Sequence, residues 1–346
     1  MIEKHYTIHN IVNFTIKSTT IPKRMAIEYA NFETDHINRP DFTIEIGDFI
    51  PSNEDCSLID HTYFIKKGYF YCKDSYKFGK WAVEVNGLES DELHLNISTN
   101  FIGLYAADMF ICAYIIDFFI RYTLERKGYS VVHAASMSKD NHALLFPSQS
   151  GAGKTTTAVY LAEDGYDYLG DDFVILHKGQ VFSYPTPLNV FSYNLNPVIR
   201  SGLPFQDRIL LKIKSALYKI TAGRIKIFTK MNPVDIPNFN VVENSNLDTI
   251  YLLSQGEKLE VTPANPDFVV NSLIINQKLE SYPFLKYFIE YSYEFPNSDI
   301  ARFWNTCEKN LKMNLEGDMQ YYEARIPRHY TSEIFKKFQE VMECGN

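Results

Sequence analysis

Closely spaced cysteines are missing from this sequence. Its five cysteines, at positions 56, 72, 112, 307 and 344, are far apart and do not have the spacing of a metal-binding motif. Because their number is odd, they cannot all form disulfides within one chain, and the simplest expectation is a reduced chain in the cytoplasm. Residues 1–5 contain no apolar core of a signal peptide, which agrees with that expectation.

Long uncharged hydrophobic runs are missing as well. The most apolar stretch is 107–127, but Asp108, Asp117 and Arg121 interrupt it before it reaches the length of about 18 residues that suggests a membrane span. Basic residues near its end and Gly128 after it are typical of a helix that stops there. We expect a buried core helix, with a membrane segment as the alternative.

Positive charge is in deficit. The 346 residues include 34 Lys and Arg against 42 Asp and Glu, which gives a formal net charge of −8. General affinity for nucleic acid is therefore not expected, although a local basic site is compatible with this balance. Hydrophobic residues, by contrast, are abundant in this sequence. With 45% hydrophobic and 15% aromatic residues, it is a globular chain with a large core in one or two domains.

Residues 1–128 are rich in strand signals. Glycine-containing turns separate several short segments that alternate apolar and polar residues or concentrate aromatic ones, namely 41–48, 63–65, 69–71, 80–85 and 93–97. They predict a meander of short antiparallel strands, which the helix at 107–127 follows. Residues 129–346 alternate strand and helix patterns, so that we expect a β-rich region at 1–128 and an α/β domain at 129–346.

Periodicity gives the expected elements of the second region. A Lys-Gly turn joins two strand patterns at 173–177 and 180–184. Further strands are expected at 249–253, 257–261 and 321–326, and helices at 268–275, 285–293, 300–311 and 332–342. Between them, residues 208–230 carry seven basic residues and no acidic one, and their first half has the spacing of an amphipathic helix. This stretch is either a solvated helix face or a surface for an acidic peptide or phosphates.

The strongest local signal is a small-residue turn between a strand and a helix. Residues 143–146 form a buried-strand pattern, and 158–162 place apolar residues on one side of a helix that Gly165 ends. Small residues in the turn let backbone N–H groups face phosphate oxygens, while a lysine and a hydroxyl reach the β/γ-phosphates and Mg²⁺. Nucleotide-binding residues are therefore expected at Ser148, Ser150, Gly151, Ala152, Gly153, Lys154, Thr155 and Thr156.

Two further motifs flank this loop. Upstream, 131–136 is an apolar strand pattern that contains His133, and downstream Asp171 and Asp172 stand at the edge of a strand. Phosphoryl transfer uses carboxylates in separate roles, one near Mg²⁺ and one as acceptor of a hydroxyl proton. Adjacent residues of an extended chain point in different directions, which suits such a division. Each motif also has a structural explanation, as a turn or as a core histidine.

The three motifs together resemble the nucleotide-binding core of HPr kinase/phosphorylase. They are His133-Ala134-Ala135-Ser136, residues 150–155, and Gly170-Asp171-Asp172, and a similar trio occurs in phosphoenolpyruvate carboxykinase. His133 lies 21 residues before Lys154 and Asp171 lies 17 after it. The resemblance covers about residues 129–190 and implies an α/β fold with a P-loop core of this type within 129–346.

The resemblance also implies roles for individual residues. Lys154 would bind the phosphates of ATP, Thr155 and Asp172 would bind Mg²⁺, and Asp171 would be the general base that activates a serine hydroxyl. His133 would support the metal and the phosphates. The implied reaction transfers the γ-phosphoryl group of ATP to a hydroxyl.

The chain departs from this family in two places. Ser148 stands where the full loop pattern has glycine, and 184–190 do not match the glycine-rich segment that helps true HPr kinases to recognise HPr. The chain is more similar to the HPr-kinase-like proteins encoded beside peptide-modification genes, including lasso-peptide clusters. Their substrate is a precursor peptide, and residues 208–230 are a candidate surface for one.

The expected function is thus an ATP- and Mg²⁺-dependent kinase for a peptide or protein, without a membrane span. A small-molecule kinase and a nucleotide-binding scaffold without chemistry remain open as alternatives. A carboxykinase is disfavoured because the sequence offers no recognisable second metal site, and a motor ATPase because no arginine-finger pattern is present. Arg200, Arg325 and Arg328 are candidates for an arginine that assists transfer.

Overall fold

The computed structural model describes residues 1–346 except 77–78, 101–110, 191–196, 204, 221–228 and 345–346. The chain forms two compact units. Residues 1–129 and 278–310 make the N-terminal unit, and residues 130–277 and 311–346 make the C-terminal unit. Residues 278–310 thus pack with the N-terminal region, whereas the sequence patterns grouped them with the domain at 129–346.

The N-terminal unit is built on a nine-stranded sheet in the order β3-β1-β2-β4-β9-β8-β7-β6-β5. Its strands are β1 (Ile2–Ile8), β2 (Val12–Ser18), β3 (Glu33–Thr34), β4 (Phe42–Ile46), β5 (Ser57–Ile59), β6 (Tyr63–Lys66), β7 (Tyr69–Tyr76), β8 (Gly79–Asn86) and β9 (Leu93–Thr99). Its helices include α1 (Lys23–Glu28), α3 (Asp117–Arg126) and α8 (Ile289–Glu294). The sheet is mixed, because β4 pairs in parallel with both β2 and β9.

The expectation of an antiparallel meander is therefore wrong for half of this sheet. Strands β5 to β9 do form a meander, but β1 and β2 make a separate hairpin that the strand signals at 41–97 do not include. The chain then returns through α1 to place β4 beside β2. Parallel pairing depends on contacts between distant segments, so local alternation cannot show it.

The apolar stretch at 107–127 is helical where the structure describes it. Its first residues, 107–110, lie outside the described part, residues 111–116 form a π-helical turn, and α3 completes the stretch. Phe118, Phe119 and Tyr122 of α3 are buried in an aromatic cluster, as expected of a core helix. Among the described helices, none combines the length and the hydropathy needed to cross a bilayer.

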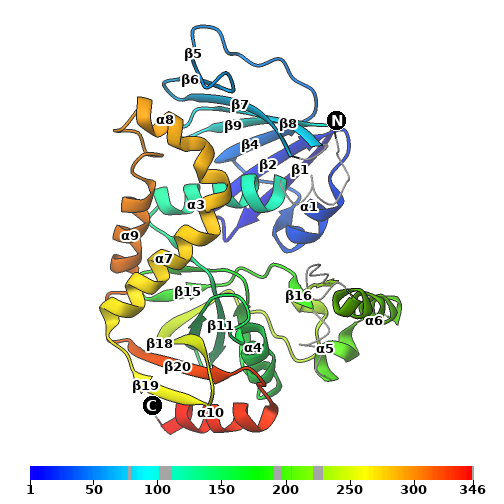
Figure 1. Cartoon of the computed structure of the whole chain (residues 1–346), viewed down its shortest axis with the longest axis vertical. Helices are drawn as coiled ribbons and strands as arrows, with labels where there is room; N and C mark the ends of the chain where they lie inside the picture. The colour runs from blue at the N-terminus through cyan, green and yellow to red at the C-terminus, as the bar shows by residue number, and fades with distance from the viewer. Residues whose placement is uncertain (77–78, 101–110, 191–196, 204, 221–228, 345–346) are drawn as a thin grey trace. The chain divides into compact units, whose positions relative to one another are not determined.

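The C-terminal unit contains a second nine-stranded mixed sheet (Figure 1). Its main path is β10-β14-β15-β18-β12-β11-β13, and β20 pairs with β18 and β19. The strands are β10 (Ser130–Val132), β11 (Ala134–Lys139), β12 (His142–Pro147), β13 (Asp167–Gly170), β14 (Val174–His177), β15 (Gln180–Phe182), β18 (Asn244–Gly256), β19 (Glu260–Pro263) and β20 (Gln320–Pro327). A small separate sheet pairs β16 (Leu188–Val190) with β17 (Thr229–Met231). The coarse expectation of an α/β fold is confirmed.

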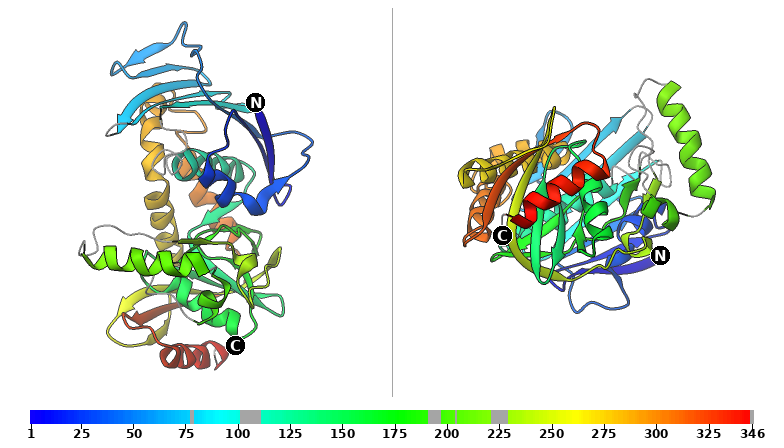
Figure 2. Two further views of the ribbon diagram at one scale, coloured as in Figure 1. Left: turned by 90° about the vertical axis from the view of Figure 1, so that its right-hand side faces the viewer. Right: turned by 90° about the horizontal axis from the view of Figure 1, so that it is seen from below.

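Both faces of this sheet are buried, which explains the continuous apolar run of β12. Leu144 and Phe146 belong to one core cluster, and Ala143 and Leu145 to another. The helices of the unit are α4 (Lys154–Glu163), α5 (Pro197–Gly202), α6 (Phe205–Ile220) and α10 (Ser332–Cys344), while α7 (Pro266–Leu285) and α9 (Phe303–Asn314) begin in one unit and end in the other. Helices α4 and α10 contribute to the first cluster, and α10 covers the sheet in the view from below (Figure 2).

Helix α4 ends as its sequence predicts. Gly165 follows it with φ of +79°, in the left-handed region that glycine adopts without a steric penalty. The N–H groups of Gly165 and Tyr166 donate to the carbonyl oxygens of Ala162 and Leu161 at 3.2 and 3.0 Å. These bonds satisfy carbonyls at the end of the helix and turn the chain back into β13.

Gly170, the last residue of β13, is required for a different reason. A Cβ there would overlap the carbonyl oxygen of Phe173 and lie 2.7 Å from Val174 Cγ1. We therefore expect Gly170→Ala to lower the free energy of unfolding by about 2–3 kcal/mol. Gly165→Ala is the matched control, since its Cβ would meet open space and only the positive φ costs about 1 kcal/mol. Chemical unfolding followed by circular dichroism tests this ranking, and equal losses would contradict it.

Candidate functional site

Strand register brings the three sequence motifs to one edge of the C-terminal sheet. Strand β11 lies between β12 and β13 and is antiparallel to both. Ala134, at the start of β11, pairs with Pro147 at the end of β12, and Ser136 pairs with Gly170 at the end of β13. The residues just outside these strand ends, His133, Ser148 and Asp171, therefore leave the sheet at the same edge.

His133 interrupts the strand in which the sequence placed it. The chain breaks between β10, which pairs with β14, and β11, which pairs with β12 and β13. The backbone oxygen of His133 accepts a hydrogen bond from Asn276 Nδ2 at 3.3 Å. Its ring is buried beside that of Phe173, with 5.5 Å between the ring centroids. His133 thus lines the same edge, in contact with the segment that follows Asp171.

The loop between β12 and α4 takes a conformation that depends on its glycines. Gly151 and Gly153 have φ of +89° and +102°, values that disfavour residues with a Cβ. Lys154, the first residue of α4, is buried, and its Nζ donates to the carbonyl oxygen of Ser148 at 2.8 Å and to Ser148 Oγ at 3.3 Å. The lysine amine is therefore held inside the turn of the loop. Ser148 supplies the acceptors of both these hydrogen bonds.

The other predicted loop residues surround this lysine. Ala152 is buried, whereas Ser150 and Gly151 are exposed at the turn. Thr155 and Thr156 are half-buried on the first turn of α4, with Thr155 directed to the carboxylate of Asp171. Exposed backbone beside a buried amine at a helix N-terminus is an arrangement that suits an anion.

Side chains from elements that are distant in the sequence contact the loop and stabilise its conformation. Gln255 Nε2, near the end of β18, donates to the carbonyl oxygen of Gly151 at 2.9 Å. Tyr330, after β20, lies against Gly153, and its hydroxyl accepts from Thr157 Oγ1 at 3.3 Å. A Cβ at position 153 would lie 3.2 Å from the Tyr330 ring, a tight contact that adds to the preference for glycine set by the positive φ.

Asp171 is the central acidic residue of the site. Its Oδ2 accepts a hydrogen bond from Thr155 Oγ1 at 2.8 Å. Its Oδ1 is buried and has no hydrogen-bond partner among the described residues. Burial and the neighbouring Asp172 carboxylate raise the pKa of Asp171 to about 7, against the opposing effects of the Thr155 hydroxyl, Lys154 and Lys230. A carboxylate that is half-ionised at neutral pH, with one unused oxygen, can take up a proton.

Asp172 points elsewhere, as expected for adjacent residues. Its Oδ2 accepts from Asn189 Nδ2 at 3.0 Å, and the side chain is half-buried. Within the described residues there is no cluster of three or more His, Cys, Asp or Glu that could hold a metal ion by itself. A cation here would have Thr155 and carboxylate oxygens as its protein ligands and would need phosphate or water for the rest. That ligand set is typical of Mg²⁺.

Sequence reasoning missed several polar residues of this site. Asn276 bridges two motifs, since its Nδ2 also lies 3.4 Å from the Ser148 carbonyl oxygen, and Asn189 holds Asp172. Lys230 belongs to the basic stretch at 208–230, for which the sequence suggests a solvated face or a binding surface and no contact with the carboxylates. It pairs with Asn189 in the β16–β17 ladder, and its charge acts on Asp171. Apart from the charge of Lys230, nothing in the local sequence indicates that these residues belong to the site.

The arginine candidates are not close partners of Asp171. Arg200, Arg325 and Arg328 are all exposed, and Arg325 forms an ion pair with Glu260 at 3.8 Å. The positive charges that lower the pKa of Asp171 come from Lys154 and Lys230. In this structure the lysines, rather than the arginines, therefore supply the positive charge near the carboxylate.

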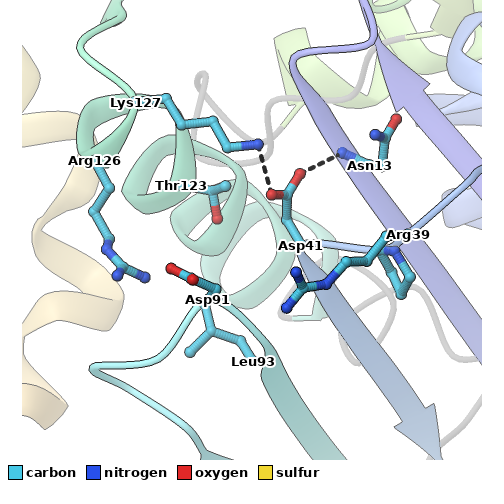
Figure 3. Close-up of a pocket in the computed structure, with 9 residues that line it drawn as sticks. Asn13, Arg39, Asp41, Asp91, Leu93, Thr123, Arg126 and Lys127 are labelled. Atoms are coloured by element: carbon cyan, nitrogen blue, oxygen red, sulfur yellow. Dashed lines mark hydrogen bonds and ion pairs between the residues drawn. The ribbon is translucent and has the colours of Figure 1, made fainter.

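A separate pocket of about 400 Å³ occurs in the N-terminal unit (Figure 3). None of the predicted site residues lines it. Lys127 Nζ and Asp41 form an ion pair of 2.5 Å in its wall, and the Asn13 N–H donates to the same carboxylate at 2.8 Å. The charges of its lining thus largely neutralise one another. The chemically distinctive groups are those around Asp171.

Comparison with models of known protein families and with curated protein sequences finds no match. The residues and geometry of this chain are therefore the basis for assigning a function.

The raised pKa of Asp171 has a consequence for stability. The folded protein keeps a proton that the unfolded chain, with an ordinary pKa of 3.8, releases between about pH 4 and pH 7. Folding stability therefore falls as the pH rises through this window. We expect Asp171→Asn, which cannot ionise, to raise the melting temperature by several degrees at pH 8 and by much less at pH 5.

The control for this measurement is Asp318→Asn, which changes an exposed carboxylate of the same unit. Its melting temperature should follow that of the wild type at both pH values. A gain from Asp171→Asn that is the same at pH 5 and pH 8, or a loss at pH 8, would show that burial does not raise the pKa of this carboxyl.

Proposed function

We propose that this protein is an ATP- and Mg²⁺-dependent kinase that phosphorylates a serine, or a similar hydroxyl, of a peptide or protein. In this proposal residues 129–346 contain a P-loop core of the HPr kinase type. One observation carries it. The Thr155 hydroxyl, 2.8 Å from Asp171, joins the loop that contains Lys154 to a buried carboxylate with a neutral pKa. A phosphate-binding turn and a proton acceptor are the two parts that phosphoryl transfer requires.

The residues present fit a nucleotide and its metal. The backbone of 150–153 and the amine of Lys154 would bind the phosphates, and Lys154 would exchange its contact with Ser148 for a phosphate oxygen. Thr155 and Asp172 would bind Mg²⁺, which neutralises phosphate charge when bound. His133, at the same edge, would support this end of the site. The orphaned Oδ1 of Asp171 agrees with a ligand that completes its hydrogen bonding.

The chemical role of Asp171 follows from its surroundings. Its carboxylate would accept the proton of the acceptor hydroxyl while the hydroxyl oxygen forms a bond to the γ-phosphorus. The bond between that phosphorus and the bridging oxygen of ATP breaks, and ADP leaves with the electron pair. The Thr155 hydrogen bond holds one carboxylate oxygen, which leaves Oδ1 to receive the proton. A pKa of about 7 lets a fraction of Asp171 act as base at neutral pH.

The first test compares transfer from γ-labelled ATP in an extract of the protein's own cells. We expect the wild type to label a peptide or protein. Lys154→Ala should lose both nucleotide binding and transfer, whereas Asp171→Asn should bind ATP normally and lose transfer by a factor of about 10² or more. Lys258→Ala, which removes an exposed lysine of the same unit, should transfer at the wild-type rate.

The position of the label separates the alternatives. Label in a small molecule only would favour a small-molecule kinase. ATP binding without transfer to any acceptor would favour a scaffold. Normal transfer by Asp171→Asn would show that another group accepts the proton.

The pH dependence tests the carboxylate pair itself. If Asp171 must be ionised, kcat/KM should rise with pH and reach half its maximum near pH 7, because this parameter reports the free enzyme. Asp172 is the second cause of the raised pKa, after burial. Asp172→Asn should therefore move the midpoint to lower pH, whatever it does to the maximum rate. If the midpoint of this variant is the same as that of the wild type, the rise of kcat/KM with pH belongs to a group other than Asp171.

A further inference from the structure

Helix α6 presents large apolar side chains to solvent. Phe205 is 74% exposed, Ile209 45%, Leu210 42% and Ile213 53%. Phe205, Ile209 and Ile213 are four residues apart, so they follow one another along one face of the helix. Single exposed apolar residues are ordinary in folded proteins, but a row of four on one helix is typical of a surface that binds another molecule.

The same helix is anchored to the C-terminal unit on another side. Leu211 is buried in the core cluster that also contains Ile199 and Leu203 of the α5 segment. Arg208 Nε donates to the Leu203 carbonyl oxygen at 2.8 Å, and its Nη2 donates to that of Ser201 at 3.2 Å. Figure 2 shows α6 beside the sheet of this unit rather than within its layers. The apolar face is therefore additional to what the helix needs for its attachment.

The charge of this part of the chain indicates what would cover that face. Residues 208–230 contain seven of the 34 basic residues and no acidic one, which leaves 27 basic against 42 acidic residues elsewhere. Four of the seven lie in α6, whose first turn also carries one acidic residue, Asp207, and residues 221–228 are outside the described part of the chain. The helix thus combines an exposed apolar row with a local excess of positive charge in an acidic protein. A complementary partner is apolar and acidic.

We propose that α6 is the docking surface for an acidic amphipathic segment of the acceptor peptide or protein. This inference rests on the proposed kinase function and names the chemistry by which that kinase recognises its substrate. An anionic bilayer fits less well, because the acidic remainder of the chain would be repelled from it. A second copy pairing through α6 would place basic helix against basic helix. Both are outcomes that the experiment separates.

The binding test uses the full-length protein and a fluorescent synthetic peptide of about 18 residues. In the probe, leucines at helical spacing form one face and glutamates fill the other positions. A second peptide of the same composition has its leucines scrambled around the helix, so that it keeps the charge and loses the face. We expect the first peptide to bind in fluorescence anisotropy and the scrambled one to bind about tenfold or more weakly.

The variant for this test is the double substitution Phe205→Ser with Ile213→Ser. It should weaken binding of the amphipathic peptide about tenfold or more. The matched control is Phe268→Ser with Ile275→Ser, which removes the same residue types, 50% and 58% exposed, from α7 of the same unit and should bind as the wild type does. Thermal unfolding of both variants checks that they fold. Equal binding by the two variants, or equal binding of both peptides, would overturn the proposal.

Further outcomes identify the other occupants. The wild type could sediment with phosphatidylglycerol vesicles while the α6 variant does not, and neither could bind the peptide. This result would assign the face to a membrane and overturn the inference. The wild type could instead form concentration-dependent dimers that the α6 variant cannot form, without binding the peptide. This result would assign the apolar face to a second copy of the chain and would also overturn the inference.

The two proposals can fail separately. Peptide binding needs no chemistry, so Asp171→Asn should bind the amphipathic peptide as tightly as the wild type does. If peptide binds through α6 but no acceptor is ever phosphorylated, the docking surface stands and the kinase function fails. If an acceptor is identified and the α6 variant phosphorylates it with unchanged KM, the kinase function stands and the docking surface fails.

Discussion

The hydrogen bond from Thr155 to Asp171 connects the two halves of the candidate site, the loop that contains Lys154 and the buried carboxylate after β13. Asp171 is buried beside another carboxylate, which is an unfavourable place for a negative charge. The Thr155 hydroxyl, Lys154 and Lys230 offset part of that cost. The part of the cost that is not offset raises the pKa of Asp171 to about 7. A chain selected for stability alone would have no reason to keep this carboxyl, so its presence agrees with a chemical role.

The sheet supplies the rigidity that such a group needs. With both faces of β12 buried and β11 paired on each side, the strand ends that position His133, Ser148 and Asp171 cannot move independently. Asn276 adds a direct tie by donating to the backbone oxygens of His133 and Ser148. It also offers the Ser148 carbonyl a second donor besides Lys154. If Lys154 turned toward a phosphate, that buried carbonyl would keep a partner.

How much the sequence predicts depends on the distance over which each feature is encoded. The strand, loop and helix at 143–163 are contiguous, and their pattern predicted the observed elements closely. The carboxylate pair is predicted from its residue type and its position after a strand, and its role stays a prediction. Gln255, Asn276 and Tyr330 lie more than 100 residues beyond the loop, and a single polar residue adds no periodic pattern from which its position could be predicted. The mixed N-terminal sheet was mispredicted for a similar reason, since parallel pairing of β4 is set by distant partners.

The basic stretch at 208–230 shows how a single local feature can serve two purposes. Its first half forms α6, whose apolar row is exposed, and its last residue, Lys230, lies in the β17 strand opposite Asn189. Because Asn189 holds Asp172 and Lys230 acts on Asp171, one end of this segment influences the carboxylate pair. The other end, α6, is the docking surface proposed here for an acidic partner. In a chain with net negative charge, concentrating basic residues here places positive charge both where an acidic acceptor would dock and near the buried carboxylate of Asp171.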